Sequence, residues 1–182
     1  MTDTEFEQAV EQIRRGNREG LRILYEAYGD KIYRLFLGKV RSREDAEDLT
    51  SDFFLKLWEI APNHRSGTGH RAWMGTIARN MAIDHLRHTS HETPVEDTEL
   101  AGQETMTEHT TAEDTVIGKI HTADILSSLS EDEQEIVRMH LAAELTFREI
   151  ASILKRPMGT IAWKYRNAVG KLKRLAEEGK LI

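Results

Sequence analysis

Residues 145–161, LTFREIASILKRPMGTI, decide the fold, because this segment holds the signals for two helices and for the turn between them. Thr146 and Glu149 have the spacing of a capping box, in which each side chain bonds the backbone N–H of the other residue. Leu145 and Ile150 flank the box and are placed to pack on each other as a hydrophobic staple. A short helix is therefore predicted to begin directly after Thr146.

A turn and a longer helix follow the short one, which we expect to end near Leu154. Lys155-Arg156-Pro157 forms a tight turn, and Pro157 suits the first position of the next helix, where a missing N–H has no cost. Apolar residues spaced by four, three, four and three positions then predict one buried stripe: Ile161, Tyr165, Ala168, Leu172 and Leu175. The segment predicts a helix-turn-helix, whose last helix has the length to lie in a major groove of DNA.

The charge of the chain is distributed unevenly, although the net charge of the 182 residues is only −6. Residues 1–87 carry 14 basic and 14 acidic side chains, and residues 119–182 carry 11 basic and 9 acidic ones. Within the second segment, residues 147–174 hold 8 Lys and Arg against a single acid, a net charge of +7. Such a concentration fits an element that binds phosphate, and a solvated helix face is the alternative.

Residues 88–118 are predicted to be a flexible acidic linker. They contain no Lys or Arg and 8 acids, together with many Thr and His and few large apolar side chains. A segment of this composition buries too little apolar surface to offset the entropy of ordering it. Residues 1–87 and 119–182 must then fold as separate small domains.

Helical periodicity runs through both flanking segments, and an alternating strand pattern appears in neither. In the first segment, Gly16-Asn17 breaks the first helix, Ser42 with Asp45 caps another, and a loop precedes a final helix from about Arg71 to Arg87. In the second, Ser130 and Glu133 form a capping box. The apolar residues fall into successive helical faces: Phe6, Val10 and Ile13; then Leu21, Leu24, Tyr25 and Tyr28; then, as a separate face, Ile32, Leu35, Phe36 and Val40; then Leu49, Phe53, Leu57 and Trp58; and last Trp73, Ile77 and Met81. We expect an all-α protein with two small helical domains.

Several classes of protein are disfavoured by what the sequence lacks. The absence of cysteine excludes disulfides and thiolate metal sites and favours a cytoplasmic location. Neither a signal peptide nor a long apolar run is present, so no membrane insertion is expected. Phosphate-binding loops and nucleophile motifs are missing, which argues against an enzyme or a bound cofactor. His85, His88 and His91 lack further well-spaced ligands, so no metal is expected.

Three blocks of sequence, in this order, resemble the extracytoplasmic-function (ECF) sigma factors, a subfamily of the sigma-70 family. Residues 45–58, DAEDLTSDFFLKLW, are similar to the family's polymerase-binding helix, and residues 72–87, AWMGTIARNMAIDHLR, to its promoter-melting helix. Residues 149–161 resemble the helix-turn-helix of its second DNA-binding domain. The resemblance implies sigma region 2 in residues 1–87 and sigma region 4 in residues 119–182.

The resemblance also implies a function and partners. The chain would bind core RNA polymerase, direct it to specific promoter DNA and assist in opening the duplex, under the control of an anti-sigma factor. We expect a monomer when the protein is free. Two rival interpretations are a stand-alone helix-turn-helix regulator with a helical sensor domain, and a sigma mimic that titrates a regulator without touching DNA. The melting-helix block argues against the first rival, and the basic segment 147–174 argues against the second.

Candidate site residues follow from the matching blocks. For polymerase binding, the acidic face of the helix after Ser42 and two apolar anchors are expected: Asp45, Glu47, Asp48, Asp52, Phe54 and Leu55. A solvated acidic helix start is the alternative for those acids. For the minus-ten element, the loop would hold an unstacked base and the helix would hold the strand: Asn63, His64, Arg65, His70, Arg71, Arg79, Asn80 and Arg87. An ordinary surface loop is the alternative for that loop, and Trp73 is expected in the core.

The minus-thirty-five element would be recognised from the helix-turn-helix. Lys164 and Asn167 are expected to contact bases, and Trp163 either packs on a thymine methyl group or lies in its own domain. The full set is Arg148, Arg156, Thr160, Trp163, Lys164, Arg166, Asn167 and Lys171. Relatives often have Gln where Ser51 stands and glycine where Lys155 stands, which implies a strained turn at this lysine. Ala162 and Trp163 also depart from the family, so the promoter preference does not transfer from relatives.

Overall fold

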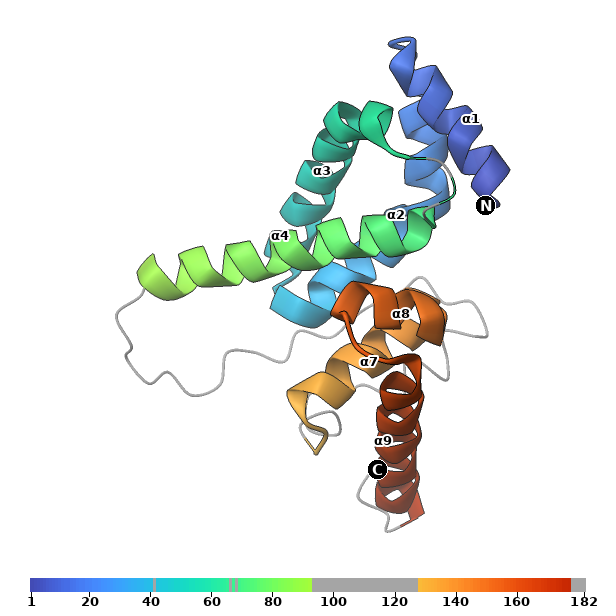
Figure 1. Cartoon of the computed structure of the whole chain (residues 1–182). Helices are drawn as coiled ribbons and strands as arrows, with labels where there is room; N and C mark the ends of the chain where they lie inside the picture. The colour runs from blue at the N-terminus through green and yellow to red at the C-terminus, as the bar shows by residue number, and fades with distance from the viewer. Residues whose placement is uncertain (41, 66, 68, 93–127, 178–182) are drawn as a thin grey trace.

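The computed structural model describes residues 1–40, 42–65, 67, 69–92 and 128–177, and throughout these residues the regular structure is helical. The first domain contains α1 (Asp3–Arg14), α2 (Arg18–Val40), α3 (Arg43–Ile60), the 3-10 turn η1 (Ala61–Asn63) and α4 (His70–Glu92). The second contains α7 (Glu131–Leu141), α8 (Phe147–Leu154) and α9 (Met158–Glu177). Figure 1 shows the two groups of helices one above the other. The prediction of an all-α protein with two helical domains is confirmed.

The first domain is built on the long helix α2, against which α1, α3 and α4 all pack. Its core contains the fully buried side chains of Phe6, Leu24, Phe36, Phe53 and Leu57. Gly20 permits the tight crossing of α1 and α2, because a Cβ atom there would lie 2.3 Å from the carbonyl oxygen of Ala9. Glycine is therefore required at the point where these two helices meet.

Helix boundaries differ from the sequence expectation at two places. The two apolar faces expected between residues 21 and 40 belong to one continuous helix, α2. The last helix of the first domain extends to Glu92 rather than ending near Arg87, so the expected linker begins with helical residues. Residues 93–118 of that linker, and residues 119–127 after it, lie outside the described residues.

The second domain confirms the helix-turn-helix signals. Ser130 caps α7 and Thr146 caps α8, each in a complete capping box with the predicted glutamate. Lys155 ends α8 in the left-handed conformation, with φ 52° and ψ 45°. Pro157 precedes α9, and its carbonyl oxygen accepts the hydrogen bond from the N–H of Ile161 at 3.2 Å. Ile161 and Ala168 are fully buried, as the predicted stripe requires.

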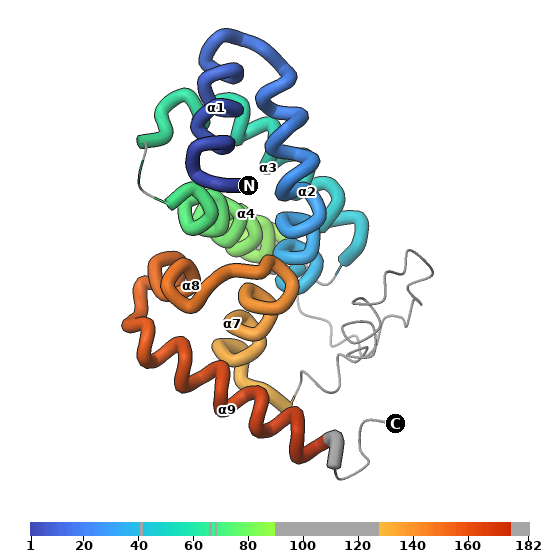
Figure 2. The backbone as a smooth tube through the Cα atoms, turned by 90° about the vertical axis from the view of Figure 1, so that its right-hand side faces the viewer, coloured from blue at the N-terminus to red at the C-terminus, as the bar shows by residue number. Residues whose placement is uncertain are grey.

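The two domains pack on each other through α4 and α8 and through α2 and α7. Figure 2 shows the second domain seated beneath α4, with α9 on the far side of α8. Ala72 belongs to the same apolar cluster as Leu145, Ile150 and Ile153, although it lies on α4. Apolar contact therefore joins the two domains into one unit in this structure.

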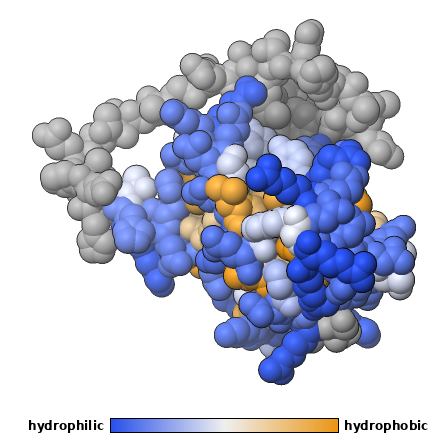
Figure 3. All heavy atoms as spheres, turned by 90° about the horizontal axis from the view of Figure 1, so that it is seen from above, coloured by the Kyte–Doolittle hydropathy of each residue, from blue (hydrophilic) through white to orange (hydrophobic). Residues whose placement is uncertain are grey.

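The face seen from above in Figure 3 is largely hydrophilic, with an apolar area near its middle.

Candidate nucleic-acid interface

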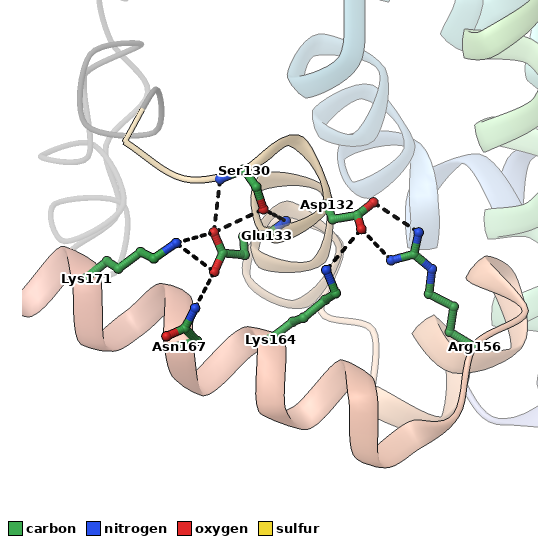
Figure 4. Close-up of polar contacts among 7 residues, drawn as sticks. All are labelled: Ser130, Asp132, Glu133, Arg156, Lys164, Asn167 and Lys171. Carbon is green, nitrogen blue, oxygen red and sulfur yellow. Dashed lines mark hydrogen bonds and ion pairs between the residues drawn. The ribbon is translucent and has the colours of Figure 1, made fainter.

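The side of α9 that faces α7 is occupied by contacts with acids. Figure 4 shows Glu133 of α7 between two side chains of α9. Lys171 Nζ donates to Glu133 Oε2 at 2.8 Å and to Oε1 at 3.0 Å, and Asn167 Nδ2 donates to Oε1 at 2.6 Å. The Glu133 side chain is only 5 % exposed, so its carboxylate is well shielded from water, whereas the Lys171 side chain is 34 % exposed. Lys171 and Asn167 therefore point toward the domain's own acid.

Asp132, the neighbour of Glu133, binds two more of the cations predicted to contact DNA. Arg156 donates to both carboxylate oxygens, at 2.6 and 3.2 Å, in a bidentate pair that also spans the turn before α9. Lys164 Nζ donates to Asp132 Oδ2 at 3.0 Å. Two consecutive acids at the start of α7 thus hold four of the predicted contact residues, as Figure 4 shows.

Both acids are strongly favoured in their ionised form. Hydrogen bonds from Arg156 and Lys164 lower the pKa of Asp132 to about 2. Burial opposes ionisation of Glu133, but hydrogen bonds from Lys171, from the backbone and hydroxyl of Ser130 and from Asn167 outweigh it and lower its pKa to about 2. At neutral pH the two carboxylates are therefore fully charged and compensate the cations of α9.

The exposed face of α9 holds only part of the set that was predicted to contact DNA. Trp163 is 58 % exposed, which decides between the two interpretations of its sequence position in favour of the surface. Arg166, Lys173 and Arg174 are also exposed, and they share one face with Trp163 because they follow it by three, ten and eleven residues along the helix. Thr160 borders this face and is half-buried.

Lys164 and Asn167, the two residues predicted to contact bases, bind acids of α7 in this structure. Both side chains are turned toward α7, because its first turn presents carboxylates to that side of α9. Arg156 and Lys171, expected to contact the DNA backbone, are held in the same way. Arg148 on α8 is exposed as expected. Lys173 and Arg174 were not among the residues predicted to contact DNA. Their spacing from Trp163 in the sequence could have indicated that they lie on the same face of the helix.

Two of the predicted minus-ten cations lie at the junction between the domains. Arg79 Nε donates to Glu135 Oε1 of α7 at 3.0 Å. Arg71 donates to the carbonyl oxygen of Glu144 and lies 3.6 Å from Glu149 Oε1. In this arrangement the second domain occupies part of the surface that was predicted to hold the promoter strand.

The remaining minus-ten residues divide into buried and exposed groups. His64 and His70, predicted to help hold an unstacked base, are buried in this structure, where both rings pack against Phe6 of α1. Asn63, Arg65 and Asn80 are exposed. Arg87 is exposed and lies 3.5 Å from Asp84 on its own helix. Trp73 packs against the core, as predicted.

The predicted polymerase surface on α3 is exposed along one stripe. Asp48, Asp52 and Leu55 share this stripe, and Leu55 is 64 % exposed. Glu47 pairs with Arg43 at 3.0 Å, and Asp45 lies 3.4 Å from His85 Nε2.

The second apolar anchor predicted for the polymerase is not on the surface. The structure corrects the expectation for Phe54, whose side chain is buried against Phe53. Tyr25 of α2 also packs edge-on against the Phe54 ring, with 4.9 Å between centroids, and is itself 55 % exposed. Tyr25, expected in the core, is therefore the apolar side chain that reaches the surface beside α3.

Comparison with known families identifies the chain. Residues 24–92 match the family model for Sigma-70 region 2, and residues 125–174 match the model for Sigma-70, region 4. The chain belongs to the sigma-70 family. Its curated relatives include ECF sigma factors. Region 2 of this sigma factor thus ends with α4, and region 4 includes α7, α8 and most of α9. Helix α1 precedes the region 2 match.

Relatives of this sigma factor are distant in sequence. It is 30 % identical over 170 residues to the ECF RNA polymerase sigma factor BldN of Streptomyces coelicolor, a match that covers 91 % of this chain and 64 % of BldN. It is 24 % identical to the RNA polymerase sigma-H factor of Pseudomonas aeruginosa over 94 % of this chain and 95 % of that protein. ECF sigma factor SigW of Bacillus subtilis is also 24 % identical, over 84 % and 86 % of the two chains.

Solved structures confirm the fold of this sigma factor. CnrH, in complex with the cytosolic domain of CnrY, superposes with a TM-score of 0.67 at 17 % identity and 97 % coverage of both chains. The sigma factor RpoE of Bartonella quintana, in complex with the anti-sigma factor NepR, gives a TM-score of 0.62 at 19 % identity, covering 86 % of this chain and 96 % of RpoE. Among the described residues of this sigma factor, no helix has the length and apolar character needed to cross a membrane.

Proposed function

We propose that this sigma factor binds core RNA polymerase, directs it to specific promoters and assists the opening of promoter DNA. The observation that carries the proposal is the division of exposed surfaces between two domains that match regions 2 and 4. One domain presents an acidic and apolar stripe, and the other presents a helix-turn-helix with an exposed aromatic and basic face. A factor that holds an enzyme and a promoter at the same time needs both kinds of surface.

The minus-thirty-five element is recognised in this proposal by the exposed face of α9. Trp163 and Arg166 lie in its first half, where a recognition helix contacts base edges, and a guanidinium suits guanine or phosphate. Thr160, a small polar residue, borders this face. Arg148 of α8 supplies a phosphate contact, which sets the register on the duplex. Lys164, Asn167, Lys171 and Arg156 reach DNA only if Asp132 and Glu133 release them.

The minus-ten element is held by region 2, at the loop before α4 and along α4 itself. Asn63, Arg65 and Asn80 are exposed for this purpose, and Arg87 lies further along the helix. Arg71 and Arg79 join them once the contacts with Glu144, Glu149 and Glu135 are broken. In this proposal the two domains separate before the promoter is engaged.

The polymerase binds along α3. Asp48 and Asp52 offer negative charge to basic groups of the enzyme, and Leu55 with Tyr25 offers apolar area. Exposed ion pairs contribute little individually, so most of the affinity comes from the apolar anchors. Phosphodiester synthesis belongs to the polymerase, and the sigma factor has no catalytic role of its own.

An anti-sigma factor is the regulatory partner in this proposal. RpoE was solved in complex with the anti-sigma factor NepR, and CnrH in complex with the cytosolic domain of CnrY. The fold of this chain is similar to the folds of both proteins. We place the protein in the cytoplasm with the polymerase, as a monomer when free of partners.

The decisive experiment is run-off transcription with core RNA polymerase and a genomic promoter library. We expect defined start sites that appear only when this chain is added. Leu55→Ala should reduce polymerase binding and initiation together, while the neighbouring exposed Lys56→Ala should leave both close to wild type. A stand-alone regulator would instead bind promoter DNA tightly without the polymerase and would be indifferent to Leu55→Ala. That result would replace the proposal.

A further inference from the structure

Helix α1 lies before the residues that match Sigma-70 region 2, yet it contacts both ends of the predicted base-capture loop. This loop, predicted over residues 63–70, connects η1 to α4, and the structure describes it except at residues 66 and 68. Its Asn63 and Arg65 are exposed, whereas the two histidines near its ends are buried. The contacts that hold the histidines therefore determine where the exposed part of the loop lies.

The first end of the loop is held by Arg14 and Glu7 of α1. Arg14 Nε donates to the carbonyl oxygen of Pro62 at 3.0 Å, and its Nη2 donates to that of His64 at 3.3 Å. His64 Nδ1 lies 3.3 Å from Glu7 Oε1, and the His64 side chain is only 2 % exposed. The Arg14 guanidinium thus bridges two backbone carbonyl groups, and the Glu7 carboxylate of the same helix contacts the His64 ring.

The second end of the loop is held by Asp3. His70 Nδ1 lies 2.5 Å from Asp3 Oδ1, and Tyr28 Oη lies 2.5 Å from His70 Nε2. A carboxylate only accepts, so the proton of the neutral ring is on Nδ1, and Nε2 accepts from the tyrosine hydroxyl. Burial lowers the pKa of His70, which keeps the ring neutral at pH 7 in this arrangement.

Phe6 spaces the two ends of the loop. Its ring stacks on His70 with 4.5 Å between centroids and an interplanar angle of 15°. The edge contact with His64 has a centroid distance of 5.1 Å and an angle of 78°. Phe6 is fully buried, so its ring is a fixed wall between the two histidines.

We propose that α1 positions the 63–70 loop for capture of an unpaired minus-ten base, an inference that rests on the proposed function. Asp3, Phe6, Glu7 and Arg14 are positioning residues, and none of them needs to touch DNA. Gly67 and Gly69 have φ of +81° and +78°, and a Cβ atom at either glycine would contact nothing within 4 Å. Because no neighbouring atom packs against the loop at these two positions, its placement depends on the contacts at its ends. The backbone between the histidines therefore receives little support from neighbouring side chains at these two glycines.

Arg14 and Arg15 offer a matched pair of variants. Arg14→Gln removes the contacts with Pro62 and His64, while Arg15→Gln removes only an exposed pair with Glu11 on the same helix. The starting and final residues are the same in the two variants. In hydrogen exchange on the full chain, we expect amides of residues 61–70 to exchange faster in Arg14→Gln and to stay unchanged in Arg15→Gln.

The functional test uses core polymerase, the full chain and a promoter library varied at both promoter elements. We expect Arg14→Gln to lose about tenfold of its selectivity at the minus-ten positions, the size of one base contact. Its selectivity at minus-thirty-five and its affinity for the core enzyme should stay at the wild-type level. Arg15→Gln should match the wild type at both elements. Glu7→Gln provides a second, milder variant with the same expected direction, should Arg14→Gln unfold.

The possible outcomes separate the two levels of inference. Retained minus-ten selectivity in both Arg14→Gln and Glu7→Gln would overturn the positioning role while leaving the proposed function intact. Equal losses at both promoter elements would overturn it too, because they would indicate a general loss of structure. A wild-type chain that starts no transcription with core polymerase would sink the proposed function and this inference together.

Discussion

Arg79 of α4 and Glu135 of α7 meet across the boundary between the two domains, with Nε 3.0 Å from Oε1. Lys39 of α2 approaches the same oxygen at 3.6 Å. The Glu135 side chain is 14 % exposed, so the carboxylate is largely shielded from water between the two cations. One acid of region 4 thus holds two basic side chains of region 2, including one that we assign to the promoter.

Glu135→Gln should therefore loosen the contact between the domains. The partner cations, Arg79 and Lys39, are 30 % and 34 % exposed, so each pair contributes about 1 kcal/mol at most and the change in folding free energy will be small. The distance between the domains is the more direct measurement. The chain contains no cysteine, so dyes at E59C and K173C report it by energy transfer without competing sites. Glu131→Gln, exposed on the same helix, is the control. Equal transfer in both variants would mean that Glu135 does not hold the domains together.

Gly75→Ala should destabilise the protein although alanine is the better helix former. A Cβ atom at Gly75 would lie 2.6 Å from Cδ1 of Ile153, a buried side chain of the other domain. Overpacking typically costs about 1–3 kcal/mol, which exceeds the helix-propensity gain of about 0.5–1 kcal/mol. Gly170→Ala is the matched control, because nothing lies within 4 Å of a Cβ atom there. Urea denaturation should show opposite signs for the two substitutions, and a gain in both would refute the tight contact.

Lys155→Gly should stabilise region 4. Lys155 ends α8 with φ 52°, in the left-handed region that costs a residue with a side chain about 1 kcal/mol relative to glycine. Ser152→Gly, within the same helix, should instead lose about 0.5–1 kcal/mol, because glycine weakens a helix interior. Thermal denaturation distinguishes the two. A lower melting temperature for Lys155→Gly would indicate that the lysine side chain contributes more than its backbone strain costs.

Acid should weaken region 4 in a defined range of pH. The pKa values of Asp132 and Glu133 are about 2 in the folded protein and near 4 in an unfolded chain. Their contribution is complete above the unfolded value and is lost as the pH falls from about 4.5 toward 2. Glu133→Gln keeps a capping residue but removes the charge, so it should cost about 2 kcal/mol at pH 6. The deficit should shrink as the pH approaches 2 in urea titrations. A constant deficit would exclude a charge effect.

Arg166→Gln should weaken promoter binding by the complete holoenzyme, and the salt dependence of binding should become shallower by about one ion. Lys164→Gln should have the smaller effect on DNA binding and the larger effect on stability, because Lys164 bonds Asp132. Trp163→Ala should alter the preferred upstream sequence, since the ring is exposed on the same face as Arg166. Electrophoretic mobility shifts at two salt concentrations test the effects on binding, thermal denaturation tests the stability of Lys164→Gln, and shifts with DNA varied at the upstream element test Trp163→Ala. If Lys164→Gln weakened DNA binding more than Arg166→Gln did, the side of α9 that faces α7 would be the one that contacts DNA.

Local signals in the sequence predicted the helices well. The capping boxes at Ser130 and Thr146 and the strained turn at Lys155 were all anticipated, because each depends on residues within a few positions of one another. The buried stripe of α9 was equally accessible from its spacing. These features follow from backbone geometry and from short-range hydrogen bonds.

Long-range partners were beyond the reach of the same reasoning. The periodicity of α9 separates its faces, but it does not reveal that Asp132 and Glu133 lie opposite Lys164 and Lys171. His64 and His70 were predicted to contact an unstacked base, and the sequence did not reveal that Phe6, far away in the chain, packs against both rings. Phe54 was misplaced because exposure on a helix of a bundle depends on which neighbours cover it.

Glu133 performs two structural roles at once, since it completes the cap of α7 and holds Lys171 and Asn167 of α9. Replacing it would disturb the beginning of one helix and the orientation of another in a single step. Divergence among descendants of this gene is thus expected to spare position 133. The residues at positions 163 and 166 do not combine two structural roles in this way, so these positions are free to change as new target sites are acquired.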